Sequence, residues 1–539
     1  MFLTITLSII LALLLLVLLL TYKIGNTYRY FVVQSIPGPR PSFIFGNLLP
    51  LWQSTITGNG ISRQLEKWTK EFGSVYGLFE GFRQPRVWVV SDIKFIENVF
   101  IKQFSSFIPR KPVALINNPN EKNPNLITAV GHSWKRHRQI MNPTFSTLKL
   151  KDMLPLMNSC VTQFLSKLPT NIDFNVYAFY KRLTFDVICS CGFGLQQSSS
   201  STSSSPTIIS KTTYEDYFEK TKELFSTDLT QRWWLRLTVV LGSMSLLSRM
   251  IEKFIRLADS LKRYLNECEI LPLKWRMKFV ELPRFWLNDR VSEIVDRAEI
   301  DDSDGMKRND FVHILLRALK KDSESGSMSY GEILNNISLF MAAGYETSSS
   351  ALAYSTYVLA THMDEQLKLQ MEIDDVDFVE NGLDYDSIIR KFEYLDRFIR
   401  EVLRMYPIPP QVINRQCEHD TTVTDSNGRE YMIKKGDIVQ PDIYSIHYSS
   451  DYWGSVDPYI FYPDRHLSIP PHTPSFLAFG LGPRHCIGMR FALLEIKLTL
   501  IRLLKNYTIV KSDQLDEKWN INEKRVITPD ECWIKLEKR

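Results

Sequence analysis

Several signatures of catalysis and nucleotide binding are missing from the sequence. No G-x-G-x-x-G fingerprint, Walker loop or H-E-x-x-H segment occurs in its 539 residues, which argues against the common dinucleotide, nucleoside-triphosphate and zinc-peptidase sites. Net charge is also small, because 65 basic residues stand against 60 acidic ones and leave only +5. This excess is too small to indicate a nucleic-acid partner.

Cysteine is scarce and irregularly spaced. An odd number without a regular pattern argues against a disulfide framework. Cys189 and Cys191 form a C-x-C pair, but no second Cys or His pair lies near them, so we expect packing cysteines rather than zinc ligands. Cys486 differs from the others, because glycines and a proline surround it. The seven cysteines are Cys160, Cys189, Cys191, Cys268, Cys417, Cys486 and Cys532.

Charge is absent from the first 22 residues, and the run from Phe2 to Leu20 is almost wholly aliphatic. About 19 helical residues at about 1.5 Å each span about 28 Å, which matches the hydrocarbon core of a bilayer. A cleaved signal peptide is the alternative, but it normally has a basic start, a shorter apolar run and a small-residue cleavage site. We therefore expect residues 1–22 to be a transmembrane signal anchor.

Basic residues and prolines follow the apolar run. Lys23, Arg29 and Arg40 flank its C-terminal side, so the positive-inside rule places the bulk of the protein in the cytosol. The segment Pro37-Gly38-Pro39-Arg40-Pro41 is stiff and extended. We expect residues 23–42 to be a hinge and residues 43–539 to form one large domain, since no clean linker interrupts them.

The surroundings of Cys486 favour a thiolate. Gly480, Gly482 and Pro483 force a non-helical loop, and a strong helix-forming segment begins at Met489. The sulfur is thus expected at the N-terminal end of a helix, where the backbone N–H groups and the macrodipole stabilise negative charge.

Residues Phe479 to Gly488 spell F-x-x-G-x-R-x-C-x-G, which resembles the haem-binding loop of the cytochrome P-450 superfamily. The resemblance implies a mainly α fold with small β-sheets (α+β) and one haem b. It implies Cys486 as the axial ligand of the haem iron, with Phe479, Arg484 and Gly488 in the cofactor-binding loop. The alternative is a buried structural cysteine in a glycine turn.

Apolar spacing predicts a long helix from Tyr330 to about Thr361. Its interior holds Ala343-Gly344-Tyr345-Glu346-Thr347-Ser348, and a buried glycine and acid are costly there unless they are used. The segment is similar to the oxygen-activation motif of the same family. That similarity implies that Gly344 opens the helix to dioxygen, while Glu346 and Thr347 relay protons through water. A helix kink without chemistry is the alternative.

A second amphipathic helix is marked by apolar residues from Ile388 to Leu403 and ends before Pro407. Glu401 and Arg404 are three residues apart near its end and can pair. They match the family's E-x-x-R motif, which implies a buried network with Arg465. Asp464 and His466 depart from the family's P-E-R-F pattern, so the local packing around Arg465 is in question.

Four residues are implied as contacts of the haem propionates. Trp134 and Arg138 lie four apart, on one helical face, and resemble the family's W-x-x-x-R pair; Arg415 and Arg484 are implied by position. From the residues alone, W-x-x-x-R is a weak motif, and a cationic surface helix is the better explanation of Trp134 and Arg138. Lys135 and Arg136 point elsewhere and are expected to offer a basic docking face to an acidic electron donor.

The resemblance predicts a haem-thiolate monooxygenase that inserts one oxygen atom into a lipophilic small molecule, such as a xenobiotic, steroid or fatty-acid-like compound. The animal microsomal group that oxidises xenobiotics and steroids is the most similar. We expect a single-pass protein of the endoplasmic reticulum membrane with its catalytic domain in the cytosol. After the hinge no residues are left for a flavin domain, so electrons are expected from an NADPH-dependent flavoprotein reductase, with cytochrome b5 as a further candidate donor.

Two alternatives remain. A haem-thiolate isomerase or dehydratase acting on peroxides would not need the acid and alcohol, so Glu346 and Thr347 argue against it. A membrane-anchored haem- or lipid-binding protein without turnover is disfavoured by the intact cysteine loop. The stretch 233–286, rich in Trp and basic residues, is expected either to form ordinary amphipathic helices or to make a second, shallow membrane contact. The substrate is not predicted.

Overall fold

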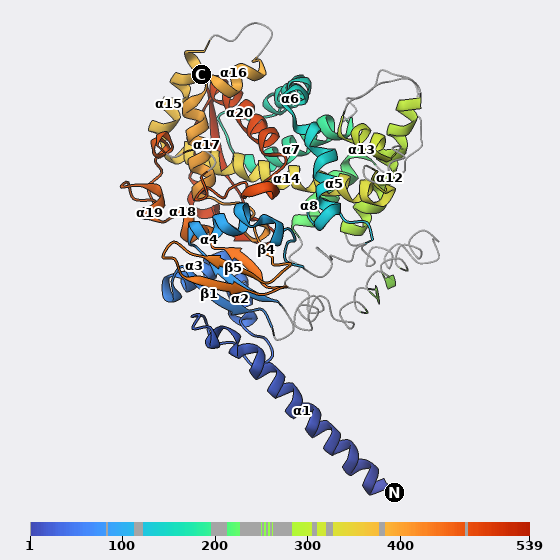
Figure 1. Cartoon of the computed structure of the whole chain (residues 1–539). Coiled ribbons are helices and arrows are strands. Elements are labelled where there is room, and N and C mark those ends of the chain that lie inside the picture. Colours follow the sequence, from blue (N-terminus) through green and yellow to red (C-terminus); the bar gives the residue numbers. More distant parts are fainter. Residues whose placement is uncertain are drawn as a thin grey trace. The chain divides into compact units, whose positions relative to one another are not determined.

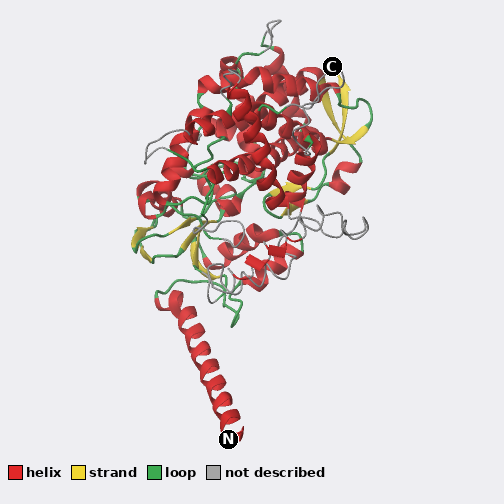
Figure 2. Ribbon diagram, turned by 90° about the vertical axis from the view of Figure 1, so that its right-hand side faces the viewer, coloured by secondary structure: helices red, strands yellow, loops and turns green. Residues whose placement is uncertain are grey.

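Helices dominate the computed structural model, and the strands form small sheets (Figure 2). The structure describes residues 2–81, 85–112, 122–195, 213–226, 283–303, 310–319, 327–376, 383–468 and 473–539, together with positions 250, 253, 254, 257, 258, 261 and 470. The chain divides into two compact units, each of which joins segments that are far apart in the sequence. The single catalytic domain expected for 43–539 stays a prediction.

The first unit comprises Met1–Asn118, Leu229–Phe254 and Gln411–Ile446. Its four-stranded sheet has the order β1-β2-β7-β4. β1 and β2 form an antiparallel hairpin, and β2 also pairs in parallel with β7, so strands that are far apart in the sequence lie side by side in one sheet. The elements are α1 Phe2–Val33, α2 Leu48–Ile56, α3 Gly60–Phe72, β1 Val75–Phe79, β2 Arg86–Val90, α4 Ile93–Glu97, η1 Asn98–Lys102, η2 Phe104–Ser106, β4 Arg415–Gln416, β5 Thr421–Thr424, β6 Glu430–Ile433 and β7 Ile438–Pro441 (Figure 1).

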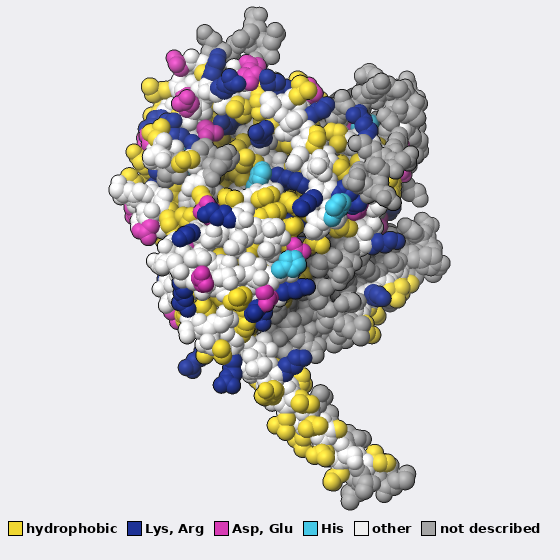
Figure 3. All heavy atoms as spheres, in the orientation of Figure 1, with side chains coloured by type: hydrophobic (Ala, Val, Ile, Leu, Met, Phe, Trp, Pro, Cys, Tyr) yellow, Lys and Arg dark blue, Asp and Glu magenta, His cyan; other side chains and the backbone are white. Residues whose placement is uncertain are grey.

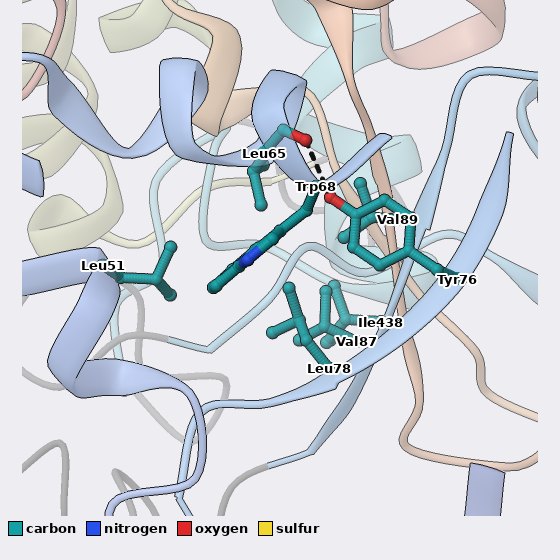
Figure 4. Close-up of a cluster of buried hydrophobic side chains, with 8 residues drawn as sticks. All are labelled: Leu51, Leu65, Trp68, Tyr76, Leu78, Val87, Val89 and Ile438. Atoms are coloured by element: carbon teal, nitrogen blue, oxygen red, sulfur yellow. Dashed lines mark hydrogen bonds between the residues drawn. The ribbon is translucent and has the colours of Figure 1, made fainter. Parts of the chain in front are cut away.

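A hydrophobic cluster lies between this sheet and the helices α2 and α3 (Figure 4). The Trp68 ring lies among aliphatic side chains of β1, β2 and β7, and the Tyr76 hydroxyl donates a hydrogen bond to the Leu65 carbonyl at 3.0 Å. Burial of this apolar area stabilises the sheet by about 25 cal/mol per Å². The members are Leu51, Leu65, Trp68, Tyr76, Leu78, Val87, Val89 and Ile438.

Helix α1 continues beyond the predicted anchor boundary at residue 22 and ends at Val33. It is long and apolar enough to cross a membrane, and hydrophobic side chains are visible along the face of it that Figure 3 shows. The Phe31 ring is buried against Trp88 and Phe79, with ring centroids 5.0 and 5.1 Å apart. The segment expected to begin the hinge is therefore helical and packed on the sheet, because no proline occurs before Pro37 and Phe31 finds an apolar site.

The second unit comprises Pro119–Asp228, Ile255–Pro410 and His447–Arg539. Helix α14 has the predicted bounds, Tyr330–Thr361, and packs against α7 and α20 (Figure 1). Two small sheets have the orders β3-β11-β8 and β9-β10. The helices are α5 Gly131–Met141, α6 Thr147–Ser166, α7 Val176–Phe193, α8 Tyr214–Ser226, α12 Pro283–Ser303, α13 Phe311–Leu319, α14, α15 Met363–Asp374, α16 Tyr385–Arg390, α17 Glu393–Met405, α19 Ser450–Trp453, α20 Met489–Asn506 and α21 Gln514–Lys518.

The remaining elements of this unit are short. The strands are β3 Asp173–Asn175, β8 Tyr507–Lys511, β9 Ile521–Glu523, β10 Ile527–Pro529 and β11 Trp533–Lys538, and the single-turn helices are η3 Asn142–Phe145, η6 Pro463–Leu467 and η7 Gly482–Arg484. The helices α18 Ile443–His447 and η5 Pro410–Val412 lie at the junctions between the two units.

The prediction of one amphipathic helix from Ile388 to Leu403 is wrong in one respect, because this segment lies in two helices, α16 and α17. The break is stabilised from another helix. The Glu372 carboxylate accepts hydrogen bonds from the backbone N–H groups of Tyr394 and Leu395 at 2.6 and 3.0 Å. A carboxylate at this end also complements the helix dipole, so α17 begins afresh at Glu393.

Candidate active site

The Cys486 loop is held open by glycines and by its own backbone. Gly480 and Gly482 have φ angles of +73° and +69°, which a residue with a Cβ rarely adopts. The Cys486 N–H donates to the Phe479 carbonyl at 2.8 Å. Among the six cysteines that the structure describes, Cys486 alone is exposed. Its sulfur is thus accessible just before α20, where the helix dipole favours a thiolate.

Helix α5 brings two of the predicted residues to this loop. Arg138 donates to the His485 carbonyl at 2.9 Å. Burial lowers the pKa of Arg138, and the charge of Cys486 opposes that effect, so the guanidinium lies within electrostatic reach of the sulfur. Trp134 is buried one turn away, with the Arg484 guanidinium 4.9 Å from its ring centroid.

Arg484 is also tied to the chain before α5. Its guanidinium donates to the carbonyl of Ile127 at 3.2 Å and to the carbonyl of Ala129. Gly488 adjoins Phe145, since a Cβ at Gly488 would lie 4.0 Å from that ring. The structure therefore brings together Trp134, Arg138, Phe479, Arg484, Cys486 and Gly488.

Arg415 belongs to the first unit and is not among these residues. It is buried, with its guanidinium carbon 4.4 Å from the centroid of the Phe100 ring, and one guanidinium nitrogen donates to the Asn414 carbonyl at 2.7 Å. Burial, together with the nearby charge of Arg110, lowers its pKa well below the ordinary value. Its part in binding propionates stays a prediction.

The middle of α14 is buried except on one narrow face. Ala343 is exposed and Gly344 and Thr347 are partly exposed, while Tyr345 and Glu346 are buried. The Thr347 hydroxyl donates to the Ala343 carbonyl at 2.7 Å. At Gly344 a Cβ would lie 3.0 Å from Ile188 Cγ1 of α7, so this glycine permits close packing of two helices, and α14 continues through it without interruption.

Glu346 faces α7. Its Oε1 accepts a hydrogen bond from the Tyr177 hydroxyl at 2.8 Å and lies 3.3 Å from Lys181 Nζ. Its Oε2 is buried and has no partner among the described residues. Sequence reasoning missed Tyr177 and Lys181, because nothing in the local sequence shows which α7 side chains meet α14.

Glu401, Arg404 and Arg465 lie together in a buried network. Arg404 donates to both Glu401 oxygens at 2.8 and 2.9 Å, and Arg465 Nε donates to Oε1 at 2.8 Å. His466 joins them, with its Nε2 3.0 Å from Glu401 Oε2. Burial would raise the pKa of Glu401, but His466 and the two arginines outweigh it and hold that pKa at about 2. The departure from the family pattern at position 466 thus adds a partner.

Arg136, which was expected to form part of a basic docking face, is ion-paired in the structure. Arg136 forms an ion pair with Glu332, which also accepts from the Ser329 N–H in the capping box at the start of α14. This residue does not offer a free positive charge for docking, as the sequence had suggested. Lys135, its neighbour on α5, is exposed.

Glu495 is a buried acid that sequence reasoning overlooked. It lies on α20, and neither carboxyl oxygen has a hydrogen-bond partner among the described residues. Burial raises its pKa to about 8, which the nearby Ser348 hydroxyl only partly opposes. The sequence feature that could have identified Glu495 is its place as the one acidic residue in the mostly apolar segment Phe491–Leu498.

The residues around Cys486 suit a haem. The accessible sulfur can ligate iron, Arg138 and Arg484 complement negatively charged propionates, and the open face at Ala343 and Thr347 belongs to the same unit. Fold and site together define a haem-thiolate class of protein.

Comparison with known proteins agrees with this class. The family model described as Cytochrome P450 matches residues 36–534. The chain is 30% identical to the protein named cytochrome P450 3A2 of Rattus norvegicus over 531 residues, covering 95% of this chain and 93% of the relative. It is 28% identical to putative cytochrome P450 CYP13A7 of Caenorhabditis elegans, covering 99% of each chain. The chain belongs to the cytochrome P450 family.

Members of this family bind haem and are monooxygenases that take electrons from redox partners and bind lipophilic substrates. The predicted family and enzyme class are therefore confirmed, as is the predicted mainly helical fold with small sheets. Helix α1, the one helix among the described residues that is long and apolar enough to span a membrane, suggests membrane anchoring.

Proposed function

We propose that this protein binds haem b through Cys486 and inserts one atom of dioxygen into a lipophilic small molecule of the xenobiotic, steroid or fatty-acid-like kind. Electrons come from a separate NADPH-dependent flavoprotein reductase, with cytochrome b5 as a second donor. The observation that carries the proposal is the Cys486 loop, in which an accessible sulfur precedes α20 and lies within electrostatic reach of Arg138.

Each predicted residue has one task in this proposal. When bound, haem supplies the iron chemistry that activates dioxygen, and a thiolate ligand favours O–O cleavage. The Cys486 thiolate holds the iron. Trp134, Arg138, Arg415 and Arg484 hold the propionates. Thr347 and Glu346 hold and pass protons, Gly344 lets α14 approach α7, and Glu401, Arg404 and Arg465 fix the packing of α17 against η6.

The central test is spectroscopic. The reduced, CO-treated protein should show the red-shifted Soret band of thiolate ligation, and Cys486→Ser should lose it. Cys160→Ser is the matched control and should keep the band, because Cys160 lies on α6 and is half-buried. A band that survives in Cys486→Ser would show that another residue ligates the iron.

We also propose a single-pass location in the endoplasmic reticulum membrane with the catalytic units in the cytosol. Support comes from α1 and from the exposed apolar residues Phe43, Leu49 and Ile56, which follow it in the first unit. Removal of residues 2–22 should shift the protein toward the soluble fraction of disrupted cells. A full-length protein that fractionates as soluble would contradict the anchor.

The second membrane contact, proposed for 233–286, falls largely outside the described residues. Four of the large apolar side chains that are described in it are more than half exposed: Met250, Phe254, Leu257 and Leu261. Their spacing of four, three and four residues is that of one helical face. Replacing all four with Ser in the protein lacking residues 2–22 should abolish its residual binding to liposomes, whereas unchanged binding would exclude this contact.

A further inference from the structure

Residues 122–130 form a strap, the segment that runs from a contact with the first turns of α14 to the start of α5. At one end the Asn335 side chain of α14 donates a hydrogen bond to the Asn123 carbonyl at 2.6 Å. Gly331 lies against the same residue, because a Cβ at Gly331 would overlap the Asn123 side chain. At the other end Val130 directly precedes α5. The strap is therefore fixed where it begins and where it ends.

A tight turn, residues 125–129, occupies the middle of the strap. Asn125 Oδ1 accepts hydrogen bonds from the N–H groups of Ile127 and Thr128 at 3.0 and 3.1 Å. The Asn125 carbonyl accepts from the Ala129 N–H at 2.8 Å. An asparagine that bonds to the backbone two residues further on is a common way to close a turn. The turn thus has a defined shape, and its position depends on what holds it from outside.

Asn336 of α14 holds the turn from outside. Its Oδ1 accepts a hydrogen bond from the Leu126 N–H at 2.8 Å, and its Nδ2 donates to the Glu332 carbonyl of the same helix at 2.7 Å. Asn336 is 0% exposed and Leu126 is buried, so water does not take the place of this bond. A buried N–H group needs such a partner, because leaving it unpaired is costly. The position of the turn is thereby tied to α14.

The turn presents two of its carbonyl oxygens to Arg484. The Ile127 carbonyl accepts from one terminal nitrogen of the guanidinium group at 3.2 Å, and the Ala129 carbonyl accepts from the other. The guanidinium group is planar and carries its N–H donors in a fixed fork, so two acceptors fix its plane and its rotation. The Trp134 ring lies on one side of it, at 4.9 Å. The turn therefore sets the direction of the donors that remain.

We propose that Asn336 is a positioning residue for haem binding. Asn336 holds the 125–129 turn, the turn orients Arg484, and Arg484 meets a haem propionate. The inference rests on the proposed function, which assigns Arg484 to the propionates. It involves no covalent or redox step, because Asn336 only fixes the geometry of hydrogen bonds. Helix α14 thus has a second task besides its oxygen-activation motif, about two turns before Gly344.

The test measures how fast the holoprotein loses haem to an excess of apomyoglobin. Asn336→Leu removes the acceptor of the Leu126 N–H with little change in side-chain volume, whereas Asn336→Asp is isosteric and keeps the acceptor oxygen. Asn335→Leu is the matched control, because Asn335 is the next residue of α14 and also bonds to the strap, but at Asn123, before the turn. Arg484→Met, alone and combined with Asn336→Leu, completes a double-mutant cycle.

We expect Asn336→Leu to speed haem loss roughly tenfold, the size that fits a buried N–H group without its partner. Arg484→Met should speed it by at least as much. In the Arg484→Met protein, Asn336→Leu should have almost no further effect, because Asn336 acts through Arg484. Asn336→Asp should restore most of the original rate, and Asn335→Leu should leave the rate unchanged.

Hydrogen–deuterium exchange of the backbone provides a second readout, which does not depend on haem chemistry. The amides of residues 125–129 should exchange faster in Asn336→Leu and at the original rate in Asn335→Leu. Asn125→Ala opens the same turn from a partly exposed position. It should speed both exchange and haem loss, so the idea is tested even if Asn336→Leu folds poorly.

Additive effects of Asn336→Leu and Arg484→Met on haem loss would overturn the proposal, because Asn336 would then stabilise the protein without acting through Arg484. Faster exchange of the turn with unchanged haem loss would overturn it as well. If Arg484→Met lost haem no faster than the original protein, the inference would fail together with the propionate role of Arg484. The Cys486 spectrum tests the iron ligand separately, so these failures are distinguishable from a failure of the thiolate assignment.

Discussion

Glu495 is the described carboxyl whose surroundings most clearly favour the neutral form. It packs within α20 without a hydrogen-bond partner among the described residues, and burial raises its pKa to about 8. The unfolded chain has an ordinary glutamate pKa near 4.3. Between these two values the unfolded state releases a proton that the folded state keeps, so stability falls as pH rises from about 4.5 to 8.

Glu495→Gln should therefore stabilise the protein at alkaline pH. We expect a gain on the order of 3 kcal/mol at pH 9, since each pKa unit is about 1.4 kcal/mol, and little difference at pH 4.5. Urea unfolding at both pH values measures it. Glu517→Gln, at an exposed position on α21, is the control and should change neither value. An equal effect of Glu495→Gln at both pH values would contradict the raised pKa.

Single residues were predictable where they belong to a sequence motif. They were unpredictable where their role depends on contacts with distant parts of the chain. Cys486, Glu346 and Glu401 could be picked out because a reactive or charged residue interrupts a pattern. Tyr177 and Lys181 could not, since their importance depends on the rotation of α7 against α14. The predicted role of Gly344 in oxygen activation stays a prediction, whereas its neighbour Ile188 supplies a packing reason for the glycine that no local pattern contains.

Among the elements, α1 departs most from expectation. Gly77 of β1 has no side chain, and a Cβ there would lie 2.4 Å from the Phe31 ring. The Gly77 N–H also donates to the Pro37 carbonyl at 2.9 Å. Tyr30 contributes as well, with the Arg86 guanidinium carbon 3.9 Å from its ring centroid. The end of α1 and the proline segment are thus joined to the sheet.

Phe31→Ala should release this end of α1. The lost burial corresponds to about 3 kcal/mol or more for a buried aromatic ring. In detergent micelles, hydrogen–deuterium exchange of residues 24–33 should accelerate, while exchange of residues 5–20 stays slow. Val32→Ala removes an exposed side chain next to it and should have no effect. Unchanged exchange in Phe31→Ala would mean that the docking of α1 does not depend on this ring.

Element boundaries were predictable from the sequence where it contains clear helix-capping or turn residues. The capping box Ser329–Glu332 marks the start of α14, and Gly488 precedes α20. In the β1–β2 and β5–β6 hairpins, turn residues separate two β-type runs, as at Asn427-Gly428. The α16–α17 break was missed because its cap comes from Glu372, a residue on α15.

At the scale of the whole molecule, buried histidine sets the acid limit of stability. The Leu477 N–H donates to His447 Nε2 at 3.0 Å, and His447 Nδ1 lies 2.8 Å from the Arg404 carbonyl. Nε2 must accept and Nδ1 must donate, so the ring is neutral. Burial lowers the pKa of His447 to about 3, far below the unfolded value near 6.5.

Stability should consequently fall as pH drops below 6.5, by about 1.4 kcal/mol per pH unit down to about pH 3. Glu401, with its pKa of about 2, adds a further loss below pH 4.5. Thermal unfolding midpoints from pH 7 to 4 measure the slope. His447→Gln should flatten it, and His419→Gln, at an exposed position, should not. Equal slopes in all three proteins would exclude His447 as the sensor.

The overall class was predictable because the Cys486 loop, the α14 motif and Glu401–Arg404 occur in a fixed order. The division into two units was not, since it depends on pairing between β2 and β7. Pairing between strands so far apart in the sequence produces no recognisable local pattern, because each strand is only a short apolar run. For the same reason the sequence does not show where Arg415 lies relative to the other predicted propionate contacts, because Arg415 is on β4 of that sheet.

The parallel pair β2–β7 also has a consequence for synthesis. Val87 pairs with Ile438, so β2 leaves the ribosome roughly 350 residues before its partner, an interval of about 20 to 70 s at 5–20 residues per second. During that time α1 is already complete, while the apolar edge of Val87–Val90 lacks its neighbour. An unpaired strand edge invites aggregation. We therefore expect the nascent chain to need chaperone cover at residues 86–90 until translation passes Pro441.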